Sequence, residues 1–316
     1  MNKRRIGNSD LNVAPLAFGG NVFGWTIDEP TSFQLLDAFV GNGFNFIDTA
    51  DVYSTWVPGN KGGESETIIG NWMKKNNNRD KIVIATKVGG DMGQGKKDIS
   101  KKYILKAAAA SLKRLQTDYI DLYQTHWDDN VTPVEETLDA YAQLIKEGKI
   151  RWIGASNFSP ERLAASVAAG KKFGYPVYQS YQPEYNLCER GVFEKSYEKI
   201  CTDNHLGVIT YFSLASGFLT GKYRNDGDLS KSARGARAKN YMNDKGFAIL
   251  NALDDVAMQY RSTPASIALA WLMARPAVTA PIASATSISQ LNELMKSTGL
   301  QLGEKAIELL DEVSSK

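Results

Sequence analysis

The sequence contains little that would build a metal centre or a disulfide framework. Among its 316 residues there are two cysteines, Cys188 and Cys201, and two histidines, His126 and His205. The cysteines do not form a C-x-x-C motif, and a zinc or iron–sulfur site needs several Cys or His ligands. We therefore expect no metal site, and so few cysteines are typical of a protein from a reducing compartment.

Long hydrophobic runs and an excess of charge are absent too. No apolar stretch approaches the roughly 20 residues of a membrane-spanning helix, and the N-terminus MNKRRIGNSDLNV lacks the apolar core of a signal peptide. The 37 Lys and Arg residues nearly balance the 35 Asp and Glu residues, which leaves no broad basic surface. We expect a cytoplasmic protein that binds neither a nucleic acid nor a membrane.

What the sequence does contain is a regular alternation of two kinds of segment. Eight short apolar, β-branched runs cover residues 15–20, 44–50, 81–88, 119–126, 150–157, 176–182, 207–212 and 277–283. Segments with helical spacing of apolar residues cover 31–43, 64–75, 100–116, 134–149 and 159–174. The runs do not alternate between polar and apolar residues. This is typical of parallel strands that are covered by helices on both faces. We predict an α/β fold, a (β/α)8 TIM barrel forming one domain over 1–316, with an open doubly wound sheet as the alternative.

Signals for helix ends agree with these borders. Thr132 and Pro133 predict a cap and a first-turn proline, and Gly148 predicts the end of that helix. Ser159 and Pro160 predict another start of the same kind. Residues 213–243 are too many for a structureless connection without a function, and residues 303–316 predict an extra C-terminal helix.

Four ionisable side chains stand at the ends of three consecutive predicted strands. Asp48 and Tyr53 follow the second run, Lys87 ends the third in IVIATK, and His126 ends the fourth in YQTH. Each alone has an ordinary explanation, such as a turn, rim packing or a solvated charge. The carboxyl ends of barrel strands meet at one mouth, which is where such folds carry their chemistry. We therefore expect the four side chains to meet there.

Their chemistry suits proton transfer to a carbonyl oxygen. A phenol has a pKa of about 10, which is high for an acid working near neutral pH. An ammonium group beside it lowers this pKa, and an aspartate paired with the ammonium holds it in place. We expect Asp48 and Lys87 to tune Tyr53 in this way, while His126 orients the carbonyl oxygen. Such a set fits hydride addition to an aldehyde or ketone.

The motifs FIDTADVY, IATKVG, QTHW and GASNF, in this order, resemble the aldo-keto reductase family, including its potassium-channel β-subunit-like members. The resemblance covers nearly the whole chain, including RRIGNSDLNVAPLAFGGNVFGW at the start. It implies a barrel with an N-terminal β-hairpin that reduces aldehydes and ketones reversibly with NAD(P)H. The family's catalytic Asp, Tyr, Lys and His match Asp48, Tyr53, Lys87 and His126.

The same resemblance implies residues for the cofactor and the substrate. The carboxamide would contact Ser156, Asn157 and Gln179, and Tyr211 would stack on the nicotinamide. The pyrophosphate would lie against Ser213, Leu214, Gly217, Leu219 and Lys222. Pocket walls would come from Trp25, Trp56 and Trp127. The physiological substrate and the oligomeric state are not readable from the sequence.

The segment that would choose between NADP and NAD departs from the family pattern. Many relatives read I-P-G-A-R followed by Q-L-x-E-N, whereas this chain reads PIASATSISQLNEL. Ser284 and Thr286 replace the Gly and the Arg, Leu294 replaces the Asn, and Gln290 is retained. The Arg would have held the 2′-phosphate, yet hydroxyls at a helix start also suit a phosphate, and no acid stands in 277–292 for a ribose diol. Several basic residues, Lys222, Arg224, Arg234, Arg237 and Lys239, are further candidates. We expect NADPH to be preferred, with NAD as the alternative.

Two other functions compete with this interpretation. Residues 90–97, GDMGQGKK, fit a phosphate-binding loop, but Lys97 stands where Ser or Thr would hold Mg²⁺, and the next helix starts only near Ser100. A nucleoside triphosphatase is therefore disfavoured. The resemblance also allows a cofactor-binding regulatory subunit with vestigial reductase activity.

Overall fold

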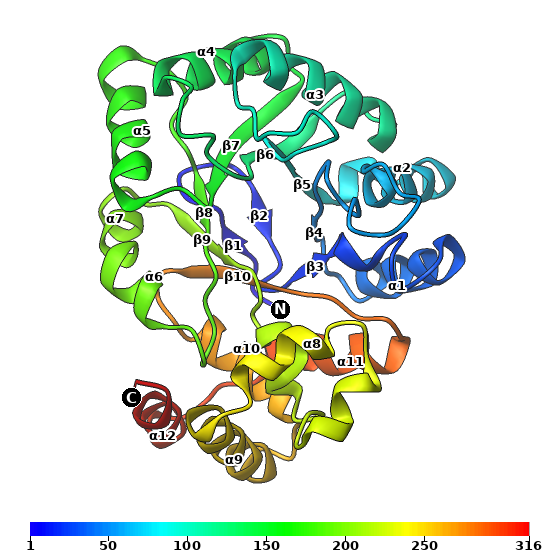
Figure 1. Cartoon of the computed structure of the whole chain (residues 1–316), viewed down its shortest axis with the longest axis vertical. Coiled ribbons are helices and arrows are strands. Elements are labelled where there is room, and N and C mark those ends of the chain that lie inside the picture. Colours follow the sequence, from blue (N-terminus) through cyan, green and yellow to red (C-terminus); the bar gives the residue numbers. More distant parts are fainter. Residues whose placement is uncertain (316) are drawn as a thin grey trace.

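Eight parallel strands form a closed barrel in the computed structural model, which describes residues 1–315 (Figure 1). The strands are β3 Ala17–Gly19, β4 Phe46–Asp48, β5 Val83–Val88, β6 Ile120–Thr125, β7 Ile150–Ser156, β8 Ser180–Gln182, β9 Gly207–Thr210 and β10 Val278–Ala283. Each pairs with the next in the chain, and β10 pairs with β3. The closed circle confirms the TIM barrel prediction and excludes the open sheet.

Helices connect the strands and cover the barrel (Figure 1). They are α1 Glu29–Gly41, α2 Glu64–Asn76, α3 Lys101–Leu115, α4 Val134–Lys146, α5 Pro160–Phe173, α6 Gly191–Ser196, α7 Glu198–Asp203, α8 Gly235–Ala238, α9 Asp244–Gln259, α10 Pro264–Met273, α11 Ile288–Lys296 and α12 Glu304–Ser315. The predicted C-terminal helix corresponds to α12, which packs against α9. None of the helices within residues 1–315 is long and apolar enough to cross a membrane.

An N-terminal hairpin closes the end of the barrel where the strands begin. Its strands, β1 Arg4–Arg5 and β2 Asn12–Val13, pair antiparallel. Ile6, Leu11 and Val13 are buried in one apolar cluster with barrel residues such as Phe46 and Leu122. The hairpin therefore supplies part of the barrel's inner core and leaves the opposite end for polar groups.

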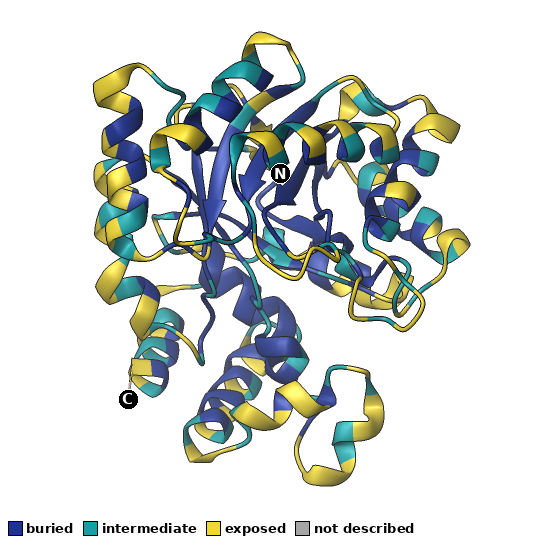
Figure 2. Ribbon diagram, turned by 45° about the horizontal axis from the view of Figure 1, so that its top comes forward, coloured by how far each residue is buried: buried dark blue, intermediate teal, exposed yellow. Residues whose placement is uncertain are grey.

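A larger apolar core lies between the barrel and its helices. Ile47 and Ile84 on the strands and Trp72 on α2 belong to it and are fully buried. Figure 2 shows the strands as buried and the surrounding helices as exposed on one side only. Each large apolar side chain buried in this way contributes about 1.5–3 kcal/mol. The two cores make the barrel a rigid frame for the side chains at its mouth.

The helix boundaries agree with the sequence signals in two of three cases. The Ser159 side chain caps α5 by accepting a hydrogen bond from the Arg162 N–H, and Pro160 is the first helical residue. Gly148 follows α4 with φ of 70°, as a helix-terminating glycine does. The expected cap at Thr132 is wrong, because Pro133 occupies the cap position and the Thr132 hydroxyl donates to Asp129 instead.

Residues 213–243 contain a series of short helical turns. They are η3 Ala215–Thr220, η4 Asp226–Lys231, α8 Gly235–Ala238 and η5 Lys239–Tyr241. Gly235 is required there, because a Cβ at this position would lie 1.7 Å from the Leu229 carbonyl oxygen. The segment is thus folded and packed, as its length predicted.

Candidate active site

Three polar side chains form one layer inside the barrel, near the carboxyl ends of the strands. Side chains of a strand alternate between its faces, and Val83 and Ala85 point into the barrel interior. Lys87 follows them at the same spacing on β5, and its register partner on β6 is Gln124. Asp48 ends β4 beside Ala85. Asp48, Lys87 and Gln124 are all buried, so the fold holds an acid, an amine and an amide in a low-dielectric layer.

Lys87 links Asp48 to Tyr53. Its Nζ lies 2.5 Å from Oδ1 of Asp48, donates to the Thr49 carbonyl at 2.8 Å and contacts the Tyr53 hydroxyl at 3.3 Å. These three acceptors match the three N–H groups of an ammonium. The ion pair is almost completely buried. The ammonium is therefore fixed in one position against the phenol.

The second oxygen of Asp48 is held by two amides. Its Oδ2 accepts hydrogen bonds from Gln182 Nε2 at 2.9 Å and from Gln124 Nε2 at 3.3 Å. Gln182 Nε2 also donates to Gln124 Oε1 at 3.2 Å. Both amides are buried, so side chains from three other strands, β5, β6 and β8, orient the carboxylate at the end of β4.

The pKa of Tyr53 differs from the sequence-based expectation. Burial, the largest influence, raises the pKa of the phenol; the Lys87 ammonium acts in the opposite direction, and the Asp48 carboxylate raises the pKa again. The result is a pKa above its usual range, so the expected net lowering is wrong. Burial lowers the pKa of Lys87, but attraction to Asp48 and Tyr53 outweighs this and leaves it raised. Both groups are protonated near neutral pH.

His126 lies beside Tyr53 as a neutral imidazole. It directly follows β6, and its ring centroid is 5.9 Å from that of Tyr53. Burial, with smaller contributions from Lys87 and Lys97, lowers its pKa well below the usual range. Its Nδ1 is buried without a hydrogen-bond partner. A neutral imidazole donates one N–H, which suits contact with a carbonyl oxygen.

The three predicted pocket-wall tryptophans lie around these groups. The ring centroid of Trp56 is 5.6 Å from that of Tyr53, and the ring centroids of Trp25 and Trp56 are 5.5 Å apart. Trp127 stacks on His126 with 3.5 Å between centroids. Trp56 is 46% exposed, so this wall borders solvent.

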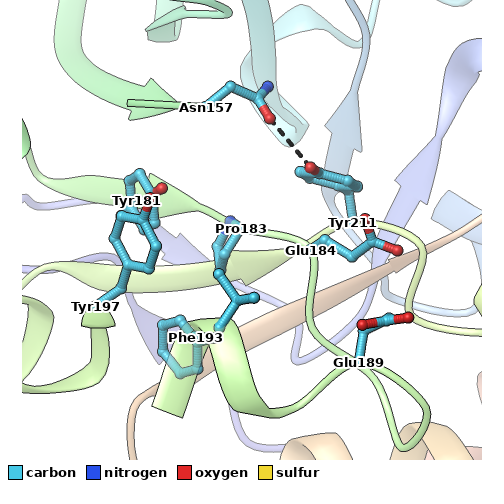
Figure 3. A pocket seen from close by; sticks show the side chains of 9 residues that line it. Asn157, Tyr181, Pro183, Glu184, Glu189, Phe193, Tyr197 and Tyr211 are labelled. Carbon is cyan, nitrogen blue, oxygen red and sulfur yellow. Dashed lines mark hydrogen bonds between the residues drawn. The ribbon is translucent and has the colours of Figure 1, made fainter. Parts of the chain in front are cut away.

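Ser156, Asn157 and Tyr211 meet at the ends of β7 and β9. Asn157 Nδ2 donates to the His126 carbonyl at 2.9 Å and to Ser156 Oγ at 3.0 Å. The Tyr211 hydroxyl donates to Asn157 Oδ1 at 3.0 Å (Figure 3). The Ser156 hydroxyl donates to the Gln182 carbonyl at 2.8 Å. The network ties these residues to the layer that holds Asp48.

A cavity of about 240 Å³ lies beside Asn157 and Tyr211 (Figure 3). Its lining is mostly aromatic and acidic: Asn157, Tyr181, Pro183, Glu184, Glu189, Val192, Phe193, Tyr197 and Tyr211. Neither Tyr53 nor His126 contributes to it. The cavity is therefore a neighbour of the polar layer and separate from it.

The assignment of Gln179 as a carboxamide ligand is wrong. Gln179 precedes β8, at the end of the barrel closed by the N-terminal hairpin, and its Oε1 accepts from the Asn8 N–H at 2.9 Å. Gln182, three residues further on, ends β8 beside Ser156 in the β7–β8 register. Gln182 is the glutamine that reaches the mouth.

The segment after β9 has an unusual backbone. Phe212, Ala215, Ser216 and Gly217 all have positive φ, between 47° and 91°. Non-glycine residues in this region are strained, and such strain is common where a backbone binds a ligand. The Ser216 hydroxyl is buried without a hydrogen-bond partner. Both features fit a loop whose N–H and O–H groups receive an anion.

The other residues predicted for the pyrophosphate lie in the same segment. Ser213 is buried and bonded to Thr210, Leu214 precedes η3, and Leu219 is buried within it. Lys222 follows, with its Nζ 3.3 Å from the position of a Cβ built on Gly217.

Ser284, Thr286 and Gln290 gather before and within the first turn of α11. Ser287 caps this helix by accepting from the Gln290 N–H. Gln290 Oε1 accepts from the Thr286 N–H at 2.9 Å and from its hydroxyl at 3.0 Å. Ser284 Oγ donates to Asn21 at 2.8 Å. The sequence analysis expected hydroxyls at a helix start here, and α11 does begin at Ile288, beside these residues.

The sequence analysis missed several buried polar residues that support this site. Gln124 and Gln182 orient Asp48, and the only signal for them was their position at strand ends. Asp51, in the segment between Asp48 and Tyr53, is buried with neither carboxyl oxygen paired, and burial raises its pKa well above the usual range. Asp51 belongs to the motif DTADVY, but nothing in that motif indicated that its side chain is buried.

The barrel, the buried Asp–Lys pair against a tyrosine and the neighbouring imidazole place the chain in a class of carbonyl-handling oxidoreductases. The chain belongs to the aldo/keto reductase family, whose sequence model matches residues 15–315.

Curated relatives cover almost the whole chain. An uncharacterized oxidoreductase, YrpG of Bacillus subtilis, is 33% identical over 98% of this chain and 94% of its own length. The aldo-keto reductase YhdN of the same organism is 34% identical over 94% of this chain and 87% of its own. A probable voltage-gated potassium channel subunit beta of Arabidopsis thaliana is 34% identical over 94% and 90%.

Proposed function

We propose that this protein reduces aldehydes and ketones to alcohols, reversibly, with NADPH as the preferred nicotinamide cofactor. The observation that carries the proposal is the contact of one buried ammonium, Lys87, with both Asp48 and Tyr53. This arrangement supplies a positioned phenol that is protonated at neutral pH beside a fixed positive charge. Reduction of a carbonyl needs such a proton donor at its oxygen.

Each polar residue has a distinct part in the proposed reaction. Tyr53 gives its hydroxyl proton to the carbonyl oxygen, and Lys87 stabilises the phenolate left behind. Asp48 holds Lys87 in place, and the neutral His126 donates an N–H to the same oxygen and so orients the substrate. The nicotinamide, when bound, supplies the hydride that reaches the carbonyl carbon. In alcohol oxidation the same groups act in reverse.

The residues around the mouth fit a nicotinamide dinucleotide. Ser156, Asn157 and Gln182 offer amide and hydroxyl groups for a carboxamide, and Tyr211 offers a ring for stacking. The segment 212–217, in which four residues have positive φ, and Lys222 suit a pyrophosphate. Ser284, Thr286 and Gln290 at the start of α11 suit the 2′-phosphate of NADPH.

The setting of this reaction is also proposed. Both cysteines are free thiols, which supports a reducing, cytoplasmic environment. One barrel carries all candidate catalytic residues, which supports treating residues 1–316 as one functional domain with a small-molecule carbonyl substrate.

A regulatory role is the second candidate. The Arabidopsis relative is named as a probable potassium channel subunit, and this name supports a cofactor-binding regulatory subunit with vestigial turnover. The complete Asp48–Lys87–Tyr53–His126 set favours the enzyme, because a regulator needs only the cofactor site.

The experiment that decides is a steady-state assay of a panel of aldehydes, ketones and alcohols with NADPH, NADH and their oxidised forms. We expect sustained turnover of small aldehydes, which is measured as the loss of absorbance of the reduced nicotinamide. Cofactor binding without steady-state turnover of any carbonyl would favour the regulatory subunit and contradict the reductase.

A further inference from the structure

Aromatic rings form much of the wall of the cavity beside Tyr211 (Figure 3). Tyr181 and Tyr197 stack on each other with 4.9 Å between their ring centroids, and both hydroxyls donate to the Phe158 carbonyl. Their polar ends are therefore already paired. Phe193 adds a further ring to the lining. The face of an aromatic ring is electron-rich, so walls of this kind suit a cation.

Two carboxylates line the same cavity. Figure 3 shows Glu184 and Glu189 on the side opposite the stacked tyrosines. Burial raises the pKa of Glu184, the Tyr241 hydroxyl opposes this by donating to the carboxylate at 3.1 Å, and Glu189 raises the pKa again by repulsion. A positive charge between the two carboxylates would remove this repulsion.

The protein's own cations do not neutralise these acids. None of the lining residues within 1–315 is a Lys, Arg or His. Arg237 lies over Phe212, with its Cζ 4.4 Å from the ring centroid, and Arg190 is already paired with two other acids. Lys245 borders an adjoining hollow, and no ion pair within residues 1–315 joins it to Glu189. The cavity therefore combines negative charge with aromatic walls.

This lining suits an organic cation better than a metal ion. A metal needs several ligands, and residues 1–315 contain no group of three or more His, Cys, Asp or Glu side chains that could hold one. The volume of about 240 Å³ is below the roughly 300–1,000 Å³ of pockets for drug-sized ligands, so the ion must be small. Pro183 and Val192 offer apolar contacts for its carbon atoms.

We propose that this cavity binds a small organic ammonium ion at a site separate from that of the carbonyl substrate. Glu184 and Glu189 balance its charge, and the aromatic rings contact its substituents. Neither Tyr53 nor His126 lines the cavity, so the bound ion is not the reacting group. The inference goes beyond the proposed reductase function and does not depend on it.

The test compares choline with 3,3-dimethylbutanol, which has nearly the same shape and no charge. Ligand-observed NMR titrations of the full chain at constant ionic strength give the two dissociation constants. We expect choline to bind at least about tenfold more tightly, because only the ammonium gains cation–π contacts and attraction to the carboxylates. Equal binding of the two probes would overturn the inference.

Substitutions of the carboxylates locate the binding site. Glu189→Gln removes the charge of an exposed side chain, so the fold should persist, and choline binding should weaken at least about fivefold while the neutral probe is unaffected. Glu184→Gln, at a half-buried position, should act in the same direction. The matched control is Glu198→Gln on α7, outside the cavity, which should bind choline as the wild type does. Unchanged choline binding in both cavity variants would contradict the inference.

Saturating NADPH separates this site from that of the cofactor. Asn157 and Tyr211 line the cavity and are also proposed to contact the nicotinamide. We expect choline binding to persist in the presence of NADPH. Complete loss of binding would place the probe in the nicotinamide site and overturn the inference. The titration needs no turnover, so a protein that binds choline as expected but reduces no carbonyl would contradict the reductase proposal alone.

Discussion

Lys87 donates hydrogen bonds to Asp48, Thr49 and Tyr53 from a side chain that is completely buried. At the scale of single residues, the proposed chemistry depends on this convergence. A buried ion pair gives little net stability, because desolvation of both charges offsets their attraction. Its retention in the barrel interior is better explained by what the ammonium does to the phenol.

We predict that Tyr53→Phe lowers kcat by about 10²–10⁴-fold, because the ring remains and only the proton donor is lost. The dissociation constant of NADPH, measured by fluorescence titration, should stay within a few-fold of the wild type. Substantial turnover in this variant would contradict the assignment of Tyr53 as the acid.

We predict that the alkaline loss of activity lies above the usual pKa of tyrosine, about 10, and moves higher still in Lys87→Met. Tyr53 donates its proton only below its pKa, and burial raises that pKa while Lys87 opposes the rise. Removing the ammonium therefore raises the pKa further. The measurement is the pH dependence of single-turnover reduction in both proteins.

The expected stability change provides a separate control for that variant. Lys87→Met leaves Asp48 buried without its charge partner, which costs about 3–5 kcal/mol of unfolding free energy. The pH profile should be recorded only on protein shown to be folded by circular dichroism. An alkaline limb that shifts to lower pH in the folded variant would refute the proposed electrostatics.

Residue-level prediction from sequence worked where strand ends were clear and failed where they were not. Asp48, Lys87 and His126 followed unmistakable apolar runs, and the structure brings them together. The run at 176–182 is longer than the strand it contains, which is only Ser180–Gln182. The sequence therefore did not indicate whether Gln179 or Gln182 lies at the C-terminal end of this strand, at the mouth of the barrel.

At the scale of elements, the start of α11 and the segment after β9 form the proposed binding surface for the cofactor phosphates. Ser287 caps α11, and Thr286 lies immediately before it with an exposed side chain. The N-terminus of a helix carries a partial positive charge and unpaired N–H groups. A phosphate near Thr286 would benefit from both.

We predict that kcat/KM favours NADPH over NADH by roughly tenfold, or about 1.4 kcal/mol, and that Thr286→Asp reverses this preference by repelling the 2′-phosphate. Asn292→Asp, which adds the same charge on an exposed position further along α11, serves as the control and should keep the preference. Equal or better wild-type kcat/KM with NADH would overturn the assignment of α11.

Element boundaries were predictable where one residue decides the backbone, as Ser159 and Gly148 do. The boundary at Thr132 was harder to predict, because the Thr132 hydroxyl donates to Asp129 and no local sequence pattern indicates this contact. The positive φ angles of Phe212, Ala215 and Ser216 could not be predicted either, because among the positive-φ residues of this segment only Gly217 favours such a conformation.

At the scale of the whole molecule, the barrel depends on an inner core that fills the space beneath the polar layer. Phe46 is fully buried in this core, together with Val13 of the N-terminal hairpin. Phe46→Ala should lower the free energy of unfolding by about 3–5 kcal/mol, because the space vacated cannot collapse inside a closed barrel. Urea denaturation measures the change. Val131→Ala, at a position 82% exposed, should have almost no effect.

The pairing of β3 with β10 also sets an order of events during synthesis. Residues 17–18 find their second neighbour only at residues 282–283, so nearly the entire chain must leave the ribosome before the circle can close. Until then β3 and β9 each present an unpaired edge, which invites pairing with other chains. Contacts so distant in sequence are slow to form. A chain that stops before β10 should therefore accumulate as an aggregate, and in the complete chain the first and last strands should gain protection from hydrogen exchange together.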